Sequence, residues 1–172
     1  MIKKAKTKIW TLTRLKGVGA SRSTLLETYI MRIRTHLVYC TPVWSGALTV
    51  YDSNRLESVQ KLACYIIIGS HMYTNYKEAL EILEIDSLSE RREKVCLTFA
   101  KKTVKNERFA YLFPKKLGLT TRNMTFQPFI EPVSRTTRYF KSPLQYLRRL
   151  LNSNEKESQN HTNNKQWLLN LV

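Results

Sequence analysis

The sequence contains little of what metal-dependent catalysis requires. Its aspartates are only Asp52 and Asp86, and each lies where a stretch of helical periodicity begins. A nucleotidyl transferase or nuclease needs two or more carboxylates that converge on metal ions, whereas an acid at a helix start is explained by capping or by the helix dipole. We therefore expect no catalytic residues, no metal site and no cofactor, and the chain alone is predicted not to be an enzyme.

Cysteines and long apolar runs are also scarce. Cys40, Cys64 and Cys96 are odd in number and widely spaced, which excludes a disulfide framework and a zinc knuckle and favours a reducing interior, in the nucleus or cytoplasm. His36 lies four residues before Cys40, a spacing that can hold a metal, but both flank an apolar helix face, and buried packing is the preferred interpretation. No apolar run reaches the roughly 18 to 20 residues of a membrane span, so no membrane partner is expected.

Basic residues are what the chain has in excess. Lys and Arg number 29 against 13 acidic residues, which gives a net charge of +16. Such a chain attracts polyanions, and nucleic acid is the commonest of them. The first 22 residues contain no acid at all. The phosphate-binding residues predicted there are Lys4, Lys8, Arg14, Lys16 and Arg22.

The spacing of apolar residues predicts an all-α bundle of about five helices. Helical periodicity covers residues 2–16, 21–39, 52–68, 75–83 and 87–105, and no segment alternates as a strand does. Residues 115–141 have no period and are expected to be extended, followed by a short helix over 142–152. The predicted division is a helical bundle at 1–113, an extended segment with its closing helix at 114–152, and a polar, disordered tail at 153–172.

The predicted helix over residues 87–105 has two distinct faces. Leu88, Val95, Phe99 and Thr103 mark its expected inner face. Lys94, Lys101, Lys105 and Arg108 follow at intervals of seven, four and three residues, on a stripe turned away from that face. Like charges four residues apart destabilise a helix, so we interpret the stripe as a second phosphate-contacting surface. A solvated polar face is the alternative.

Two polar residues interrupt apolar helix faces. Gln60 lies between Val59 and Ala63 on the face of one predicted helix, and Arg92 shares the apolar face of another. A buried guanidinium needs acceptors, and Glu57 and Gln60 are the candidates. We predict that Glu57, Gln60 and Arg92 form a buried polar link that fixes how the two helices dock.

Several segments together resemble the polyproteins of non-LTR (LINE-type, jockey-like) retrotransposons. In chain order these segments are Leu37-Val-Tyr-Cys-Thr-Pro-Val-Trp44, Leu56-Glu-Ser-Val-Gln-Lys61, Ile67-Ile-Gly69, Leu88 with Arg91-Arg92, Phe99-Ala100, and residues 142–152, which begin Ser-Pro-Leu-Gln-Tyr. Their order and spacing extend the resemblance over residues 1–152. Residues 166–172 match nothing in the family.

The resemblance implies a C-terminal thumb or connection region of a reverse transcriptase, an RNA-directed DNA polymerase, which grips the template-primer duplex. The family's catalytic aspartates lie in the palm, and no Tyr-x-Asp-Asp motif occurs here, so polymerase activity does not carry over. We expect a truncated copy, begun at an internal methionine, that binds RNA or RNA–DNA duplex with low sequence specificity and contacts the palm of a full-length enzyme. A functionless transposon relic or protein-interaction helix bundle, and an unrelated basic RNA-associated protein, are the alternatives.

Overall fold

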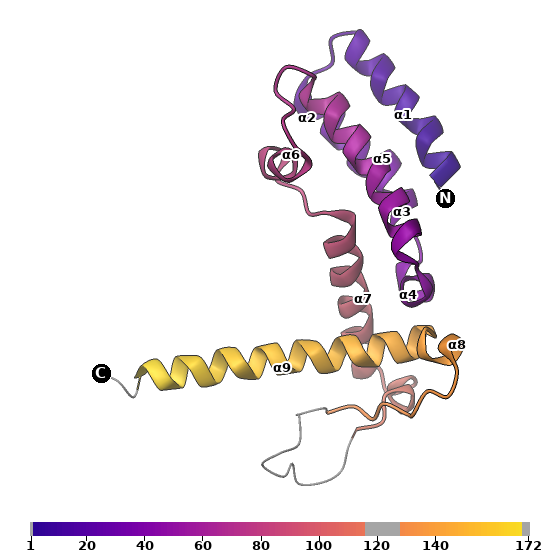
Figure 1. Cartoon of the computed structure of the whole chain (residues 1–172), viewed down its shortest axis with the longest axis vertical. Coiled ribbons are helices and arrows are strands. Elements are labelled where there is room, and N and C mark those ends of the chain that lie inside the picture. Colours follow the sequence, from indigo (N-terminus) through magenta and orange to yellow (C-terminus); the bar gives the residue numbers. More distant parts are fainter. Residues whose placement is uncertain (1, 116–127, 170–172) are drawn as a thin grey trace. The chain divides into compact units, whose positions relative to one another are not determined.

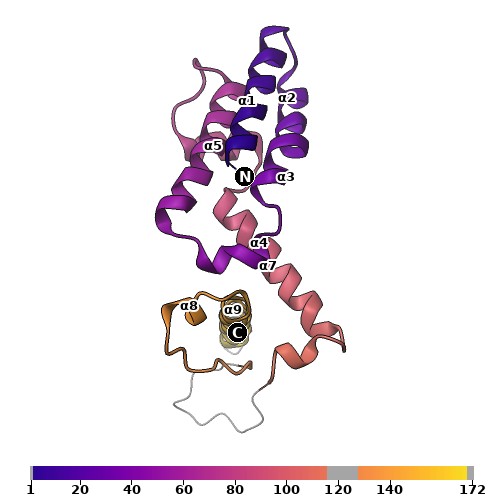
Figure 2. The same cartoon turned by 90° about the vertical axis from the view of Figure 1, so that its right-hand side faces the viewer.

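The computed structural model describes residues 2–115 and 128–169, with side chains described as far as residue 156. Within these ranges the chain forms helices and one isolated antiparallel bridge, between Lys115 and Phe129, so the all-α prediction is confirmed (Figures 1 and 2). Contacts within the chain divide it into two compact units. Unit 1 comprises residues 1–41 and 48–94, and unit 2 comprises residues 42–47 and 95–172.

Unit 1 is a small helical bundle. It contains α1 (Ile2–Gly17), α2 (Arg22–Thr28), the π-helix η1 (Tyr29–Arg34), α3 (Thr35–Leu37), α5 (Val50–Ile68), α6 (Tyr76–Leu83) and the first residues of α7 (Leu88–Lys105). α1, α2 and α5 lie side by side (Figures 1 and 2). Its core includes the buried side chains of Ala5, Ile9, Leu12, Leu25, Tyr29, Ile33, Leu37, Leu56, Val59, Ala63, Cys64 and Ile67.

The segment from α2 to α3 keeps one face in the core over its whole length. Leu25, Tyr29, Ile33 and Leu37 are all buried, as their four-residue spacing predicts. In an α-helix of 3.6 residues per turn, every fourth side chain drifts by roughly 40° around the axis. The wider turn of η1 counters this drift, because a π-helix has more residues per turn. The π geometry therefore explains how four residues at this spacing all reach the core.

The helix starts follow the capping rules. Ser21 Oγ accepts a hydrogen bond from the Thr24 N–H at 3.3 Å, so Ser21 is the cap of α2. Ser87 and Glu90 form the predicted capping box, since Ser87 Oγ accepts from the Glu90 N–H at 3.2 Å and Glu90 Oε2 accepts from the Ser87 N–H at 3.1 Å. Asp52 lies in the first turn of α5, where a carboxylate offsets the helix dipole.

Unit 2 is held together by a second core. It contains most of α4 (Thr41–Trp44), the 3₁₀ turns η2 (Ser45–Ala47) and η3 (Ala110–Leu112), the rest of α7, α8 (Thr137–Phe140) and α9 (Pro143–Leu169). The buried side chains of this core are those of Cys96, Ala100, Phe113, Phe129, Leu147 and Leu151. Asn152 joins α9 to the strand-like segment, because its amide accepts from the Phe129 N–H at 3.0 Å and donates to the Phe129 carbonyl at 3.1 Å.

The predicted inner face of α7 is wrong in its second half. Phe99 is 48% exposed and Thr103 is half-buried, whereas Cys96 and Ala100 are fully buried. The two rows, Val95 with Phe99 and Cys96 with Ala100, are offset by one residue, which is roughly 100° around the helix. The row with the smaller side chains faces the core because small residues let α7 pack closely, and the large Phe99 is left on the flank.

Two predicted boundaries differ from the structure. The short helix expected over residues 142–152 continues as α9 to Leu169, because no proline or glycine follows Pro143 to interrupt it. The bundle was expected to end at residue 113, whereas unit 2 begins inside α7, since Cys96 and Ala100 share a core with α9. Residues 116–127 of the predicted extended segment and 170–172 of the predicted tail lie outside the described residues.

Candidate nucleic-acid interface

α1 presents basic side chains to solvent. Its buried face includes Ala5, Ile9 and Leu12, and the remaining positions of the helix carry five lysines and Arg14. Of the predicted phosphate contacts, Lys4, Arg14, Lys16 and Arg22 are exposed, and Lys8 is half-buried. All five lie in unit 1, on α1 and on the start of α2 that packs against it.

Two lysines of α1 also have partners inside unit 1. The Lys16 ammonium donates to the Ile66 carbonyl in the last turn of α5. Carbonyls there lack partners within the helix, and the helix dipole favours a cation. Lys8 Nζ forms a hydrogen bond with His36 Nε2 in α3. These two lysines therefore help to fix α1 against its neighbours, whatever else they bind.

Arg14 and Arg22 contact uncharged side chains. The Arg14 guanidinium carbon lies 4.8 Å from the centre of the Trp10 ring, which is cation–π geometry. Arg22 Nη2 lies 3.4 Å from Met72 Sδ, in the connection between α5 and α6. Neither arginine faces a carboxylate in these contacts, so both keep their positive charge available to an anion.

The predicted stripe on α7 does not begin with an unopposed charge. Lys94 Nζ lies 2.6 Å from Asp86 Oδ1, an ion pair that closes the turn before α7. The hydrogen bond from Lys94 is the main reason why the pKa of the Asp86 carboxyl is lowered, with further lowering from the charges of Lys94, Arg91 and Arg34. Lys94, which the prediction groups with the phosphate contacts, therefore has a counter-ion inside unit 1. Its partner lies eight residues earlier, beyond the reach of helical spacing.

The rest of the stripe lies in unit 2 and is exposed. Lys101 and Lys105 are four residues apart on α7, and Arg108 follows in the turn after the helix. Within the described part of the chain, no ion pair or side-chain hydrogen bond is recorded for Lys101, Lys105 or the Arg108 guanidinium. Three like charges in this arrangement repel one another. A bound anion would relieve that repulsion.

The side chain of Gln60 is hydrogen-bonded to two other elements of unit 1. Its side chain is 0% exposed, Oε1 accepts from the Tyr29 hydroxyl at 2.7 Å, and Nε2 donates to the Asp86 carbonyl at 2.9 Å. One buried amide thus connects α5 to η1 on one side and to the turn before α7 on the other. Both ends of the amide have a partner, which is what makes burial of a polar group tolerable.

Glu57 and Arg92 join the same two helices through other atoms. Glu57 Oε1 accepts from the Ser89 N–H at 2.7 Å, and Oε2 accepts from the Tyr76 hydroxyl at 2.6 Å. Arg92 Nη2 donates to Ser53 Oγ at 2.8 Å. All three residues of the predicted polar link therefore connect α5 with α7 or its leading turn. The hydrogen bonds of Gln60 itself run to Tyr29 and Asp86. That this link fixes the docking of the two helices stays a prediction.

Sequence reasoning missed the tyrosines of this network. Burial is the main cause of a raised pKa for both Tyr29 and Tyr76. The hydrogen bond to Glu57 raises the pKa of Tyr76 further. The spacing predicts that Tyr29 lies on an apolar helix face. It does not predict that the Tyr29 hydroxyl donates a hydrogen bond to Gln60. The signal in the sequence is that two apolar helix faces each carry one polar group, the hydroxyl of Tyr29 and the amide of Gln60. These two groups could have suggested a buried hydrogen bond between the helices.

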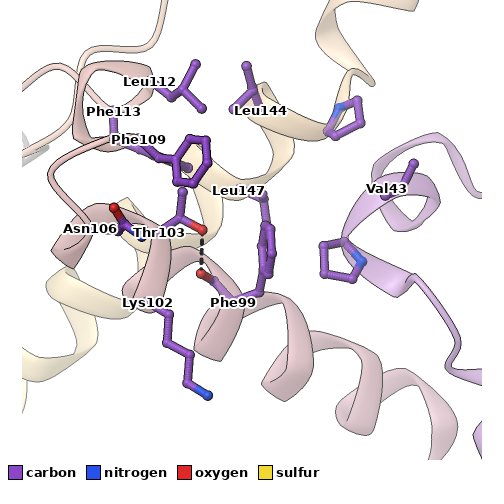
Figure 3. A pocket seen from close by; sticks show the side chains of 12 residues that line it. Val43, Phe99, Lys102, Thr103, Asn106, Phe109, Leu112, Phe113, Leu144 and Leu147 are labelled. Carbon is purple, nitrogen blue, oxygen red and sulfur yellow. Dashed lines mark hydrogen bonds between the residues drawn. The ribbon is translucent and has the colours of Figure 1, made fainter.

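Unit 2 contains an apolar pocket of about 510 Å³ (Figure 3). Phe99, Phe109 and Leu147 lie around it, and Pro42 and Val43 of α4 also line it. Thr103 keeps its hydroxyl occupied by donating to the Phe99 carbonyl at 2.8 Å, so this polar group adds little polarity to the wall. Pockets of this volume suit a small molecule or a few side chains of a partner.

His36 and Cys40 do not pack together in the core as expected. His36 is half-buried and bonded to Lys8, and Cys40 is exposed with a φ of 50°. α3 ends at Leu37, so Cys40 lies in a turn and not on the helix face that the spacing assumed. The prediction of burial was therefore wrong for Cys40.

The described residues contain no candidate metal site and no candidate membrane span. No group of three or more His, Cys, Asp or Glu side chains there is arranged to hold a metal ion. None of the described helices has the length and apolar character needed to cross a membrane. In comparisons with known proteins, no family model, no curated protein and no solved structure matches the chain.

Proposed function

We propose that this chain binds RNA–DNA or RNA duplex through the phosphate backbone, without sequence specificity and without catalysis. The observation that carries the proposal is the group formed by Lys101, Lys105 and Arg108, three exposed like charges with no recorded counter-ion in the described residues. The acid-free α1, with Lys4 and Arg14 exposed, supports it from unit 1. Lysines and arginines release condensed counterions when they replace them at phosphates, which makes such binding favourable at low salt.

Low specificity follows from the residues available. Contacts to phosphate position a protein on a duplex, whereas sequence is read by side chains that reach base edges in the grooves. The basic groups that carry the proposal lie on an exposed face of α7 and in the turn after it, and lysines and arginines at such positions are suited to phosphate contact. The proposed ligand is therefore defined by its backbone charge and its helical form.

The resemblance to non-LTR retrotransposon polyproteins gives this function a setting. A thumb or connection region grips the template-primer duplex beside a polymerase palm, and the chain has the all-α character expected of such a region. We propose that it is a thumb-like piece of such a reverse transcriptase that lacks the catalytic palm. The parent activity, RNA-directed DNA synthesis, would then require a full-length copy.

The test is fluorescence anisotropy of a labelled RNA–DNA hybrid over a series of salt concentrations. A variant with Lys101, Lys105 and Arg108 changed to Ala is compared with a control that loses the same charge at the exposed residues Arg32, Arg55 and Lys77. Loss of three phosphate contacts should reduce the slope of log K against log salt by roughly 2 to 3. The control should change the slope by less, because it lowers the net positive charge of the protein without removing the proposed phosphate contacts.

Three outcomes would overturn the proposal. The stripe is only a solvated face if both variants lose affinity equally. The chain is a relic without a nucleic-acid partner if the unchanged protein does not bind at low salt. Tighter binding to structured ribosomal RNA than to the plain hybrid would instead favour the alternative of a basic RNA-associated protein.

A second candidate function, docking of a partner protein, rests on the apolar pocket of unit 2 (Figure 3). Phe99 lines it and is nearly half exposed, which costs free energy unless something covers the ring. The palm of a full-length reverse transcriptase is the partner that the resemblance suggests. Phe99→Glu should weaken association with a purified palm in analytical ultracentrifugation, while Tyr111→Glu, at an exposed position outside the pocket, should not. Equal association of both variants would exclude the pocket as the docking surface.

A further inference from the structure

The outer face of α1 carries an exposed tryptophan. Trp10 is 62% exposed, and helical spacing places it on the side opposite Ala5, Ile9 and Leu12. Few residues gain as much as tryptophan when buried, because its side chain is the largest apolar surface available. A single exposed apolar residue is ordinary on a protein surface. The surroundings of Trp10, described next, are what make it unusual.

The neighbours of Trp10 on this face are basic. Lys3, Lys6 and Arg14 lie seven residues before, four residues before and four residues after it, and all three are exposed. Residues four apart on a helix are separated by roughly 6 Å along the axis, so the charges flank the indole on both sides. No acidic residue occurs before Glu27. The face therefore offers one flat apolar ring within a row of cations.

Arg14 also orients the ring. Its guanidinium carbon lies 4.8 Å from the ring centre, close enough for a cation–π contact over one face of the indole. A ring fixed in this way loses less conformational entropy when a ligand binds to its other face. The guanidinium remains a donor for a phosphate, since its five N–H groups are not used up by the ring.

We propose that Trp10 is a stacking platform for an unpaired nucleobase, with Lys3, Lys6 and Arg14 binding the phosphates on either side. The ligand is single-stranded nucleic acid, such as the unpaired strand next to a duplex. This inference rests on the proposed function and adds a second ligand form to it. Single-strand binders combine a basic track with aromatic rings on which bases stack. Bases inside a duplex are already stacked on each other and are not available to the ring.

Charge decides between nucleic acid and a protein as the occupant of this face. A protein partner would have to supply acidic groups for all three cations around the indole. A single strand supplies one phosphate per nucleotide, together with an aromatic base for the ring. Both needs of the face are then met by one chemical class.

The test compares two single-stranded ligands of equal charge, a labelled oligothymidylate and an abasic phosphodiester of the same length. Trp10→Ala should weaken binding of the oligothymidylate by roughly 5- to 150-fold, the usual range for loss of one base–aromatic stack. It should not change the affinity for the abasic ligand or for the RNA–DNA hybrid, because these ligands are expected to bind through their phosphates only. Trp10→Phe, which keeps a ring, should retain most of the affinity.

The chain supplies a matched control in Tyr51. This ring is 70% exposed, and Arg55 lies over it at 5.5 Å, four residues later, as Arg14 does for Trp10. The difference is that Arg55 also faces Asp52, at 3.8 Å. Tyr51→Ala should therefore leave binding of the oligothymidylate unchanged.

The outcomes separate this inference from the proposed function. If the hybrid binds with a steep salt dependence but Trp10→Ala binds the oligothymidylate as the unchanged protein does, only the stacking platform is refuted. It is also refuted if the abasic ligand binds as tightly as the oligothymidylate. If neither hybrid nor single strand binds at low salt, both proposals fall.

Discussion

Replacing Gln60 by leucine would test the network at the centre of unit 1. Leucine has a similar volume, so the change leaves little cavity and mainly removes the amide. The Tyr29 hydroxyl, on a side chain that is 0% exposed, would lose its acceptor, which costs about 1–3 kcal/mol. The bond to the Asp86 carbonyl contributes about 1 kcal/mol more, because Asp86 is half-buried and water can replace the amide there. We expect Gln60→Leu to lower the free energy of unfolding by about 2–4 kcal/mol.

A second substitution makes the prediction specific to the hydrogen bond. Adding Tyr29→Phe to Gln60→Leu removes both partners of one buried bond, and such a replacement is nearly neutral compared with removing one. The double variant should therefore be more stable than Gln60→Leu alone, with a coupling energy of about 1–3 kcal/mol. Asn54→Leu, at an exposed position on α5, is the control for adding a leucine and should change stability by less than about 0.5 kcal/mol.

Hydrogen exchange of the α5 amides is the suitable assay. The chain has two units, so a global melt can mix two transitions, whereas α5 reports unit 1 alone. The free energy of opening follows from the protection of the α5 amides in each variant. Additive losses in the double variant, or no loss in Gln60→Leu, would refute the view that Gln60 joins η1 to the turn before α7.

Three further predictions follow from burial and close packing. A Cβ on Gly46 would lie 2.7 Å from Tyr146 Cβ and 2.9 Å from the Lys141 carbonyl, so Gly46→Ala should lower the free energy of unfolding of unit 2 by about 1–3 kcal/mol, measured by hydrogen exchange of the α9 amides. Gly17→Ala, with open space around the residue, should not lower it, and equal protection in the two variants would contradict the packing. Burial raises the pKa of the Cys64 thiol to about 12, so a thiol reagent should label exposed Cys40 first and reach buried Cys64 and Cys96 only on unfolding. Rapid labelling of all three cysteines would contradict the burial of Cys64 and Cys96. The raised pKa values of Tyr29 and Tyr76 favour their neutral forms in the fold, so their contribution to stability is complete below pH 10.0, the ordinary pKa, and declines as the pH rises above it. Tyrosinate absorbance that reaches its full amplitude without loss of helical circular dichroism would refute this pH dependence.

The sequence by itself determined the helices and many of their ends. Apolar spacing placed Leu25, Tyr29, Ile33 and Leu37 on one buried face, because helical periodicity is a local property of the chain. The capping box of Ser87 and Glu90 was likewise readable, since all its atoms lie within one turn. The excess of basic residues and the acid-free start of the chain were evident from composition alone.

Only the tertiary structure decided which groups meet across elements. The turn before α7 brings Asp86 to Lys94, which spacing alone placed on the predicted basic stripe. Gln60 likewise has its hydrogen-bond partners in Tyr29 and the Asp86 carbonyl. Likewise Cys96 and Ala100, and not the larger Phe99, face the second core. Spacing along one helix shows which residues share a face. It does not show which face a neighbouring helix covers, because that depends on how closely the two surfaces can approach.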